Sequence, residues 1–140
     1  MFKPGDGMSA RPLAKIASGG EVSRVMLAIK VVLGQDDPAE TLVFDEVDSG
    51  VGGAVALSLA EVLSDLARTH QVILVTHLVQ LAVMGQVHYV ASKQGEGQPE
   101  TVFSLVEGEQ RVKELARMLS GGISLAAMEH ARQLLDGVSG

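Results

Sequence analysis

The chain has 140 residues, of which 46% are hydrophobic and 3% aromatic, and its formal net charge is -6. This length suits one globular domain, and the hydrophobic fraction is too high for a disordered chain. The absence of cysteine excludes disulfides and thiolate metal sites. The longest apolar runs are shorter than the ~18 residues of a membrane-spanning helix. We therefore expect an α/β protein of the cytoplasm that does not enter a membrane.

Positive charge is concentrated towards the amino-terminal end of the chain. Residues 1–34 carry five basic and two acidic side chains, although the whole chain is acidic. Such an excess is compatible with a phosphate-bearing partner, but scattered cations are more often simply solvated. The charge distribution therefore gives only weak support to a phosphate partner.

The first 17 residues contain two prolines and two glycines without hydrophobic periodicity, which predicts a loop or arm. Apolar residues at helical spacing then predict a helix over 18–33, ended by Gly34. Ser18 and Glu21 have the spacing of a capping box, the more common meaning of such a tetrapeptide. The intervening Gly19 and Gly20 would also leave backbone amides open to an anion such as phosphate.

A short apolar run, Thr41 to Phe44, ends in two adjacent carboxylates, Asp45 and Glu46. The run predicts a strand buried on both faces, with the acids at its carboxyl end, where open α/β sheets bind ligands. Because neighbouring side chains on extended backbone point to opposite sides, we expect one acid to hold Mg²⁺ and the other to orient water. Alternatively, the pair only solvates a loop or caps the next helix.

The next segments predict a strand–helix–strand unit. A glycine-rich loop leads into a helix over 55–67, and a second β-branched strand over 72–75 ends at Thr76 and His77. Parallel pairing would bring both strand ends to one edge of the sheet, so that His77 shares a site with the acids. A lone histidine in such a place is, however, more often a hydrogen-bonded core or cap residue.

The remaining elements are expected to be a short helix, a hairpin and two helices. The patterns place them at 78–84, at 88–92 with 101–106, at 112–119 and at 125–135. The hairpin could add an antiparallel edge to the sheet. The other three histidines lack metal-ligand spacing, and the sequence has no Gly-x-Ser-x-Gly nucleophile elbow.

Four motifs, in this order, resemble those of an ABC-type ATPase head. They are the signature motif Ser18-Gly-Gly-Glu21, the Walker B strand Leu42-Val-Phe-Asp-Glu46, the D-loop Asp48-Ser-Gly50, and the switch histidine in Thr76-His77. Transporter heads usually have Ser-Ala-Leu-Asp in the D-loop, which this chain lacks. The fuller strings at 13–24 and 44–53 resemble the RecN family of bacterial DNA repair proteins, which are SMC-like ATPases.

Two carboxyl-terminal segments, Glu114-Leu-Ala-Arg-Met-Leu119 and Glu129-His-Ala-Arg132, extend this resemblance over nearly the whole chain. It implies an α/β fold, the carboxyl-terminal lobe of an ABC-type head over residues 18–140. This lobe would have a mainly parallel sheet with flanking helices and an edge hairpin.

The resemblance also implies roles for the residues at the strand ends. Asp45 would hold Mg²⁺ through water, Glu46 would polarise the attacking water, and His77 would contact the γ-phosphate of ATP. These roles agree in kind with the chemistry expected of acids at the end of a strand. Together they describe one side of an ATP-hydrolysing site.

The signature motif would act on a second head. Ser18, Gly19 and Gly20 would bind the γ-phosphate of ATP held by that head, and the D-loop residues Asp48, Ser49 and Gly50 would lie at the joint between heads. The heads would then form an ATP-dependent homodimer. In the RecN family such heads act in DNA double-strand break repair and recombination.

The phosphate-binding loop Gly-x-x-x-x-Gly-Lys-[Ser/Thr] (Walker A) does not occur in the 140 residues. The resemblance places it on an amino-terminal lobe of the same protein, beyond a coiled coil, so this chain alone is expected to be inactive. DNA would be bound through the complete protein, in the cytoplasm and at the nucleoid. The alternatives are another SMC-like or transporter head, or a non-catalytic module that binds a protein partner.

Overall fold

The computed structural model describes residues 18–33, 40–95, 97 and 99–138. The chain divides into two compact units, one up to Thr76 and one from His77 onward. The predicted arm at 1–17 and the helix end at Gly34 lie outside the described residues, and a single domain over 18–140 stays a prediction. None of the helices in the described ranges is both long and apolar enough to cross a lipid bilayer.

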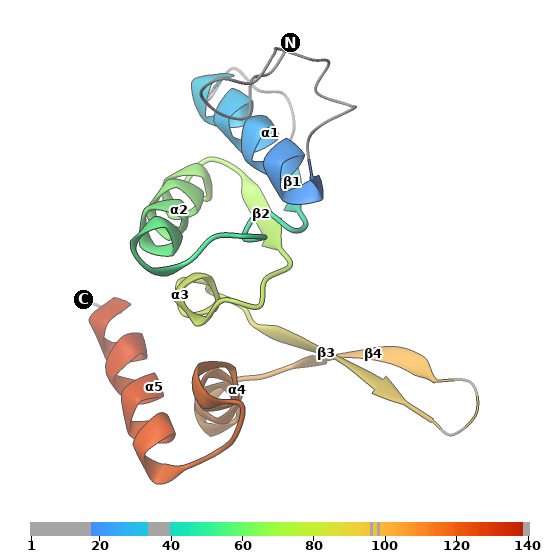
Figure 1. The fold of residues 1–140 in the computed structure, drawn as a ribbon, viewed down its shortest axis with the longest axis vertical. Coiled ribbons are helices and arrows are strands. Elements are labelled where there is room, and N and C mark those ends of the chain that lie inside the picture. Colours follow the sequence, from blue (N-terminus) through green and yellow to red (C-terminus); the bar gives the residue numbers. More distant parts are fainter. Residues whose placement is uncertain (1–17, 34–39, 96, 98, 139–140) are drawn as a thin grey trace, which may run out of the picture. The chain divides into compact units, whose positions relative to one another are not determined.

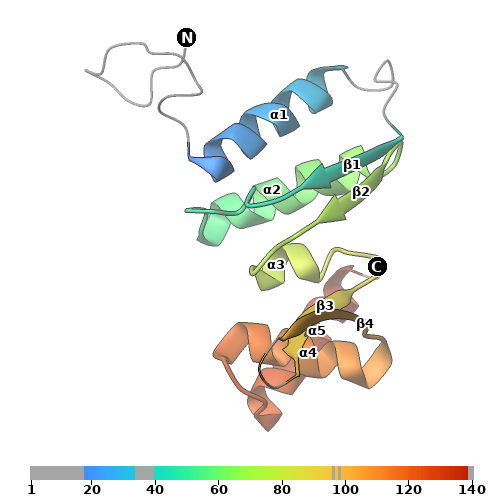
Figure 2. The same cartoon turned by 90° about the vertical axis from the view of Figure 1, so that its right-hand side faces the viewer.

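The first unit is a parallel strand pair with two helices. Its elements are α1 (Gly19–Leu33), β1 (Thr41–Phe44), α2 (Gly53–Leu66) and β2 (Gln71–Leu74). The strands pair in parallel, with Phe44 opposite Leu74, which confirms that both end at the same edge. Both helices lie beside the pair, and the start of α1 lies at the carboxyl end of β1 (Figures 1 and 2). The acidic residues after β1 therefore follow directly from this edge.

Only one face of the strand pair is buried within the described residues. Leu42 and Phe44 are buried, but Val43 between them is 66% exposed and its neighbour Ile73 is 47% exposed. The prediction of a strand buried on both faces was wrong, because the described elements bury only the face that carries Leu42 and Phe44. Along β1 a groove of about 180 Å³ is lined by Val22, Ser23, Met26, Lys30, Leu42, Val43 and Phe44.

The second unit contains a hairpin and three helices. Its elements are α3 (Val79–Ala82), β3 (Tyr89–Gln94), β4 (Glu100–Leu105), α4 (Gly108–Ser120) and α5 (Leu125–Val138). The antiparallel pairing of β3 and β4 confirms the predicted hairpin (Figure 1). In the described ranges this hairpin is a two-stranded sheet of its own and shares no ladder with β1 or β2.

The helices of the second unit enclose a small aliphatic core. Leu115, Ala116 and Ala131 have no exposed surface, and Met118 of α4 and Met128 of α5 pack against the core that they form. The chain reverses after α4 at Gly121, whose φ of +73° is the left-handed conformation of a helix C-cap. The reversal lies between the two helices predicted over 112–119 and 125–135, and so confirms that they are separate.

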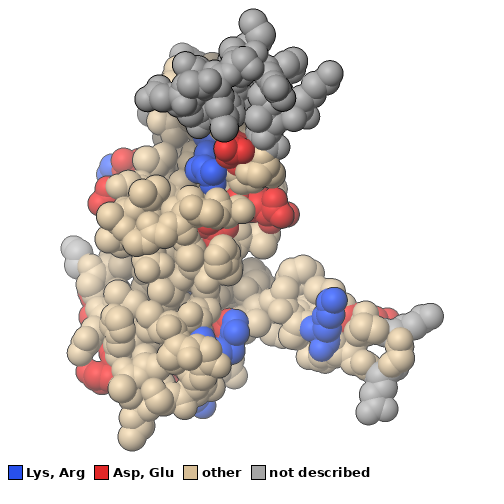
Figure 3. Space-filling view, viewed as in Figure 1, with Lys and Arg blue, Asp and Glu red and all other residues tan. Residues whose placement is uncertain are grey.

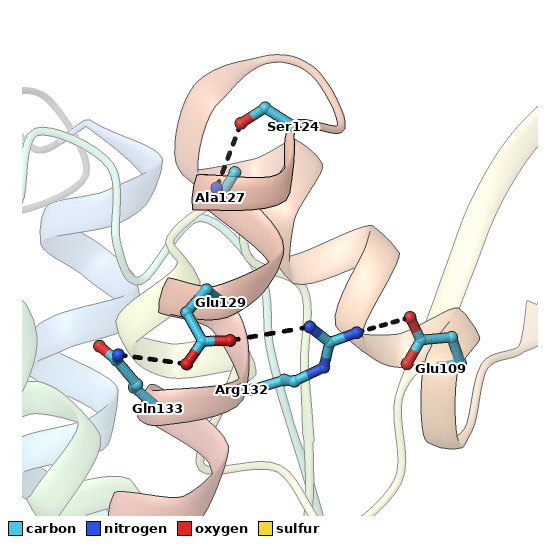
Figure 4. A network of polar contacts seen from close by, with 6 residues as sticks. All are labelled: Glu109, Ser124, Ala127, Glu129, Arg132 and Gln133. Carbon is cyan, nitrogen blue, oxygen red and sulfur yellow. Dashed lines mark hydrogen bonds and ion pairs between the residues drawn. The ribbon is translucent and has the colours of Figure 1, made fainter.

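Polar contacts join the two carboxyl-terminal helices. Ser124 Oγ accepts a hydrogen bond of 3.1 Å from the Ala127 amide and so caps α5. Arg132 on α5 reaches Glu109 on α4 at 2.8 Å and Glu129 on its own helix at 3.9 Å (Figure 4). Because these ions are exposed, the apolar core stabilises the helix pair more than they do.

Candidate functional site

A tight loop, residues 45–51, follows β1. Two backbone bonds shape it: the Ser49 amide donates to the Glu46 carbonyl at 2.9 Å, and the Val51 amide donates to the Asp48 carbonyl at 3.0 Å. Glu46 has a φ of +57°, and it is the only residue other than glycine with a positive φ in the described ranges. This conformation costs an L-residue about 1–2 kcal/mol, so surrounding contacts must hold it.

The left-handed backbone changes the relation between the two acids. We expected Asp45 and Glu46 to alternate on extended chain, and this expectation was wrong because the backbone turns at Glu46. Both residues are exposed. A division of roles between them would therefore depend on the turn and not on strand alternation.

The start of α1 is closed by the predicted capping box. The Ser18 amide donates to Glu21 Oε2 at 2.8 Å, and the Glu21 amide donates to Ser18 Oγ at 3.4 Å. The Ser18 amide and then its hydroxyl lower the pKa of Glu21, with a smaller contribution from the charge of Arg24. The box uses the amides of Ser18 and Glu21, and so leaves those of Gly19 and Gly20 to other partners.

The two glycines allow α1 to approach the loop closely. A Cβ atom on Gly20 would lie only 2.7 Å from both the Glu46 carbonyl oxygen and the Ser49 Cβ. A Cβ atom on Gly19 would collide with Glu46 Oε2, so the Glu46 carboxylate lies against the start of the helix. A negative charge is favourable there, because the helix dipole is positive at this end.

Two further residues of α1 bind the loop directly. Ser23 Oγ donates to the Asp45 carbonyl at 2.6 Å. Arg24 Nη1 donates to the carbonyls of Val47 at 3.1 Å and Ser49 at 2.8 Å. Side chains of α1 therefore hold the loop at three carbonyls, which supplies the contacts that the strained Glu46 backbone requires.

The loop is also tied to the end of β2. Asp48 is only 2% exposed, and Thr76 Oγ1 donates to its Oδ2 at 2.6 Å. Thr76 lies two residues after β2 and Asp48 four residues after β1, so their bond shows that the two strand ends meet, as predicted. His77 begins the second unit and is exposed. Its place beside Asp45 and Glu46 stays a prediction.

The described residues do not gather three or more His, Asp or Glu side chains into a metal-binding cluster. A magnesium ion held by Asp45 through water would be coordinated by water and phosphate oxygens on this side of the site. That ligand set is the usual one for Mg²⁺ beside a nucleotide, and an exposed carboxylate at a strand end fits it.

Charged groups are mixed on the face of the molecule in Figure 3, where acidic and basic side chains are scattered among uncharged ones. Of the five basic residues in 1–34, Lys3, Arg11 and Lys15 lie outside the described residues. A phosphate-facing surface formed by the amino-terminal third therefore stays a prediction.

No protein-family model matches the chain, but curated proteins do. The DNA repair protein RecN of Deinococcus radiodurans is 53% identical over 137 residues, which are 97% of this chain and 24% of that protein. RecN of Mycobacterium leprae is 54% identical over 131 residues, 93% of this chain and 22% of that protein. The chain is RecN-like over nearly its whole length. It corresponds to the carboxyl-terminal part of these relatives and spans about a quarter of their length.

More distant similarity agrees with this assignment. RecN of Halalkalibacterium halodurans is 40% identical over 132 residues, 93% of this chain and 23% of that protein. A solved structure from work on ATP-driven dimerisation and DNA-stimulated activation of SMC ATPases matches with a TM-score of 0.55. The match covers 81% of this chain and 68% of that one at 20% identity, so it supports the fold alone.

Sequence reasoning missed Ser23 and Arg24 of the RecN-like chain. They lie three and four residues after Gly20, so they share its face of α1. The signal was available, since a glycine pair that lets a helix approach a neighbour also brings the next turn of that face into contact. What the sequence could not indicate was the neighbour, which lies more than 20 residues further along the chain.

Substituting Gly20 tests the close approach. Alanine normally favours a helix by up to about 1 kcal/mol over glycine, but at Gly20 its methyl group would overlap the loop backbone. We expect Gly20→Ala to destabilise the first unit by about 1–3 kcal/mol in urea unfolding. The control is Gly137→Ala in α5, where a Cβ has open space. A Gly20→Ala variant as stable as this control would contradict the close approach.

The capping box predicts a pH dependence. Because the folded pKa of Glu21 lies below its ordinary value of 4.5, the box stabilises α1 above that pH and is lost as the pH falls through the folded pKa. Circular dichroism of the chain and of Glu21→Gln should therefore differ at neutral pH and converge in acid below 4.5. A difference that persists unchanged in acid would show that the carboxylate charge does not support the helix.

Proposed function

We propose that this chain is the carboxyl-terminal part of an SMC-like, RecN-type ATPase head that acts in DNA double-strand break repair and recombination. Its similarity to RecN of Deinococcus radiodurans over 97% of its length supports a function in DNA repair. The observation that carries the proposal is the attachment of the α1 start to the acidic loop, residues 45–51, which follows β1. Together they offer an anion-accepting helix end and two exposed carboxylates within one compact unit.

The acidic loop would serve ATP bound by the same head. Asp45 would hold Mg²⁺ through water, and the ion when bound would neutralise charge on the phosphates. Glu46 would orient and polarise the attacking water, with its carboxylate direction set by the turn at its own backbone. His77, the residue after Thr76, would contact the γ-phosphate.

The start of α1 would serve a second head. Ser18, Gly19 and Gly20 would receive the γ-phosphate of ATP held by the other copy, because the capping box leaves the glycine amides to other partners. Asp48, Ser49 and Gly50 would lie at the joint between the heads. ATP would thereby favour a homodimer, and DNA would be engaged by the complete protein in the cytoplasm, at the nucleoid.

The site would be completed by an amino-terminal lobe. The 140 residues hold no Walker A loop, and such a loop supplies the backbone cradle and the lysine for the β- and γ-phosphates. An amino-terminal part of the same kind of protein would bring it. The chain by itself should therefore bind ATP weakly and hydrolyse it negligibly.

Reconstitution with that lobe tests the proposal. We expect a mixture of this chain and the Walker A-bearing lobe of a RecN relative to hydrolyse ATP, and Glu46→Gln to lower kcat by about 100-fold or more, since it removes a general base. ATP-dependent association should persist in Glu46→Gln. Glu61→Gln, an exposed change on α2, should have full activity.

Two results would contradict the proposed function. One is sustained ATP turnover by the 140 residues alone that depends on Glu46. The other is a mixture whose turnover cannot be detected, or does not depend on Glu46, although both parts are folded. The second result would leave a non-catalytic assembly module as the better description.

A further inference from the structure

We propose that Arg24 is a positioning residue, which sets the shape of the acidic loop from the helix that carries the signature motif. The bonds in question lie within the first unit. The consequence for catalysis rests on the proposed function, but the consequence for the loop does not.

One nitrogen of Arg24 bridges the loop around its buried acid. Nη1 donates to the carbonyls of Val47 and Ser49, which flank Asp48 on both sides. A Cβ on Gly20 would lie 3.1 Å from this same nitrogen, so the guanidinium occupies space that the glycine leaves open. The glycine of the signature motif and the arginine one turn later therefore form one contact surface for the loop.

The carbonyls of the loop divide into two sets. Those of Asp45, Val47 and Ser49 accept hydrogen bonds from Ser23 and Arg24 of α1. Those of Glu46 and Asp48 accept the amides of Ser49 and Val51 within the loop. The carbonyls of residues 45 to 49 thereby all accept a hydrogen bond, and within the described residues the first set accepts from α1 side chains.

A cation is well suited to this place. Hydrogen bonds from a charged donor are about twice as strong as neutral ones, and a single guanidinium nitrogen can serve two acceptors. Without it, the carbonyls of Val47 and Ser49 would turn to water, and the loop would lose two of the contacts that oppose relaxation of Glu46 from its left-handed conformation. The direction of the Glu46 carboxylate would then be less well defined.

The consequence is a mechanical link between two sites. The first turn of α1 would contact ATP held by another head, and its second turn holds the loop that acts on the head's own ATP. A shift of the helix when phosphate arrives would be transmitted to Glu46 through Arg24. Loss of Arg24 should therefore impair the catalytic step more than the binding of ATP.

Amide hydrogen exchange of the 140-residue chain tests the structural part without any enzymatic activity. Arg24→Met keeps the aliphatic stem but removes the donors, and should speed exchange at the Ser49 and Val51 amides about tenfold or more. In Arg24→Met the β2 amides should keep their exchange rates. The control is Arg68→Met, an exposed change in the same unit, in which the amides of the loop should also keep their exchange rates. In Arg24→Lys the exchange rates of the loop should be intermediate, because lysine keeps the positive charge but has a shorter side chain.

Unchanged loop exchange in Arg24→Met would overturn the inference, and so would a uniform change across the loop and β2. If Arg24→Met unfolds the unit, Arg24→Lys decides by the same criterion, because a change confined to residues 45–51 supports the inference and any other pattern overturns it.

The catalytic part is tested in the head assembled with its amino-terminal lobe. Arg24→Met should lower kcat at least tenfold with the KM for ATP within about twofold, and Arg24→Lys should recover part of kcat. If Glu46→Gln abolishes turnover but Arg24→Met leaves kcat unchanged, the inference fails and the proposed function stands. If Glu46→Gln leaves turnover intact, the proposed function fails, and the exchange result still decides what Arg24 does to the loop.

Discussion

The close approach of the α1 start to the loop after β1 is the constraint on which the first unit depends. Two glycines remove the side chains that would keep helix and loop apart, and Ser23 and Arg24 then bind the exposed carbonyls. The strained backbone of Glu46 persists because these contacts surround it. In this unit the start of α1 and the acidic loop after β1 are therefore parts of one packed structure.

The contact between the α1 start and the loop is also electrostatic. The Glu46 carboxylate lies against the first turn of α1, where the helix dipole and the amides of the glycines favour an anion. A γ-phosphate arriving at the same helix end would bring further negative charge close to this carboxylate. In the proposed function, phosphate binding at the signature motif and the position of Glu46 are thus coupled by charge as well as by Arg24.

Local patterns in the sequence predicted the elements that depend on neighbours along the chain. The capping box, the strand over Thr41 to Phe44 and the two separate carboxyl-terminal helices follow from residue spacing, and all three are present. The exposure of Val43 and the turn at Glu46 could not be predicted, because both depend on contacts made after folding. The resemblance of four ordered motifs identified the family, whereas the partners of Arg24 became visible only in three dimensions.

We propose that the α1 start and the acidic loop act as one half of a shared ATPase site. A structure of the assembled heads with ATP and Mg²⁺ would show whether they do. We expect Ser18, Gly19 and Gly20 to contact the γ-phosphate of the opposite head and Asp45 to contact a water ligand of the magnesium ion, with the bonds of Arg24 to the loop intact. Nucleotide bound away from both motifs, or a loop detached from α1, would contradict it.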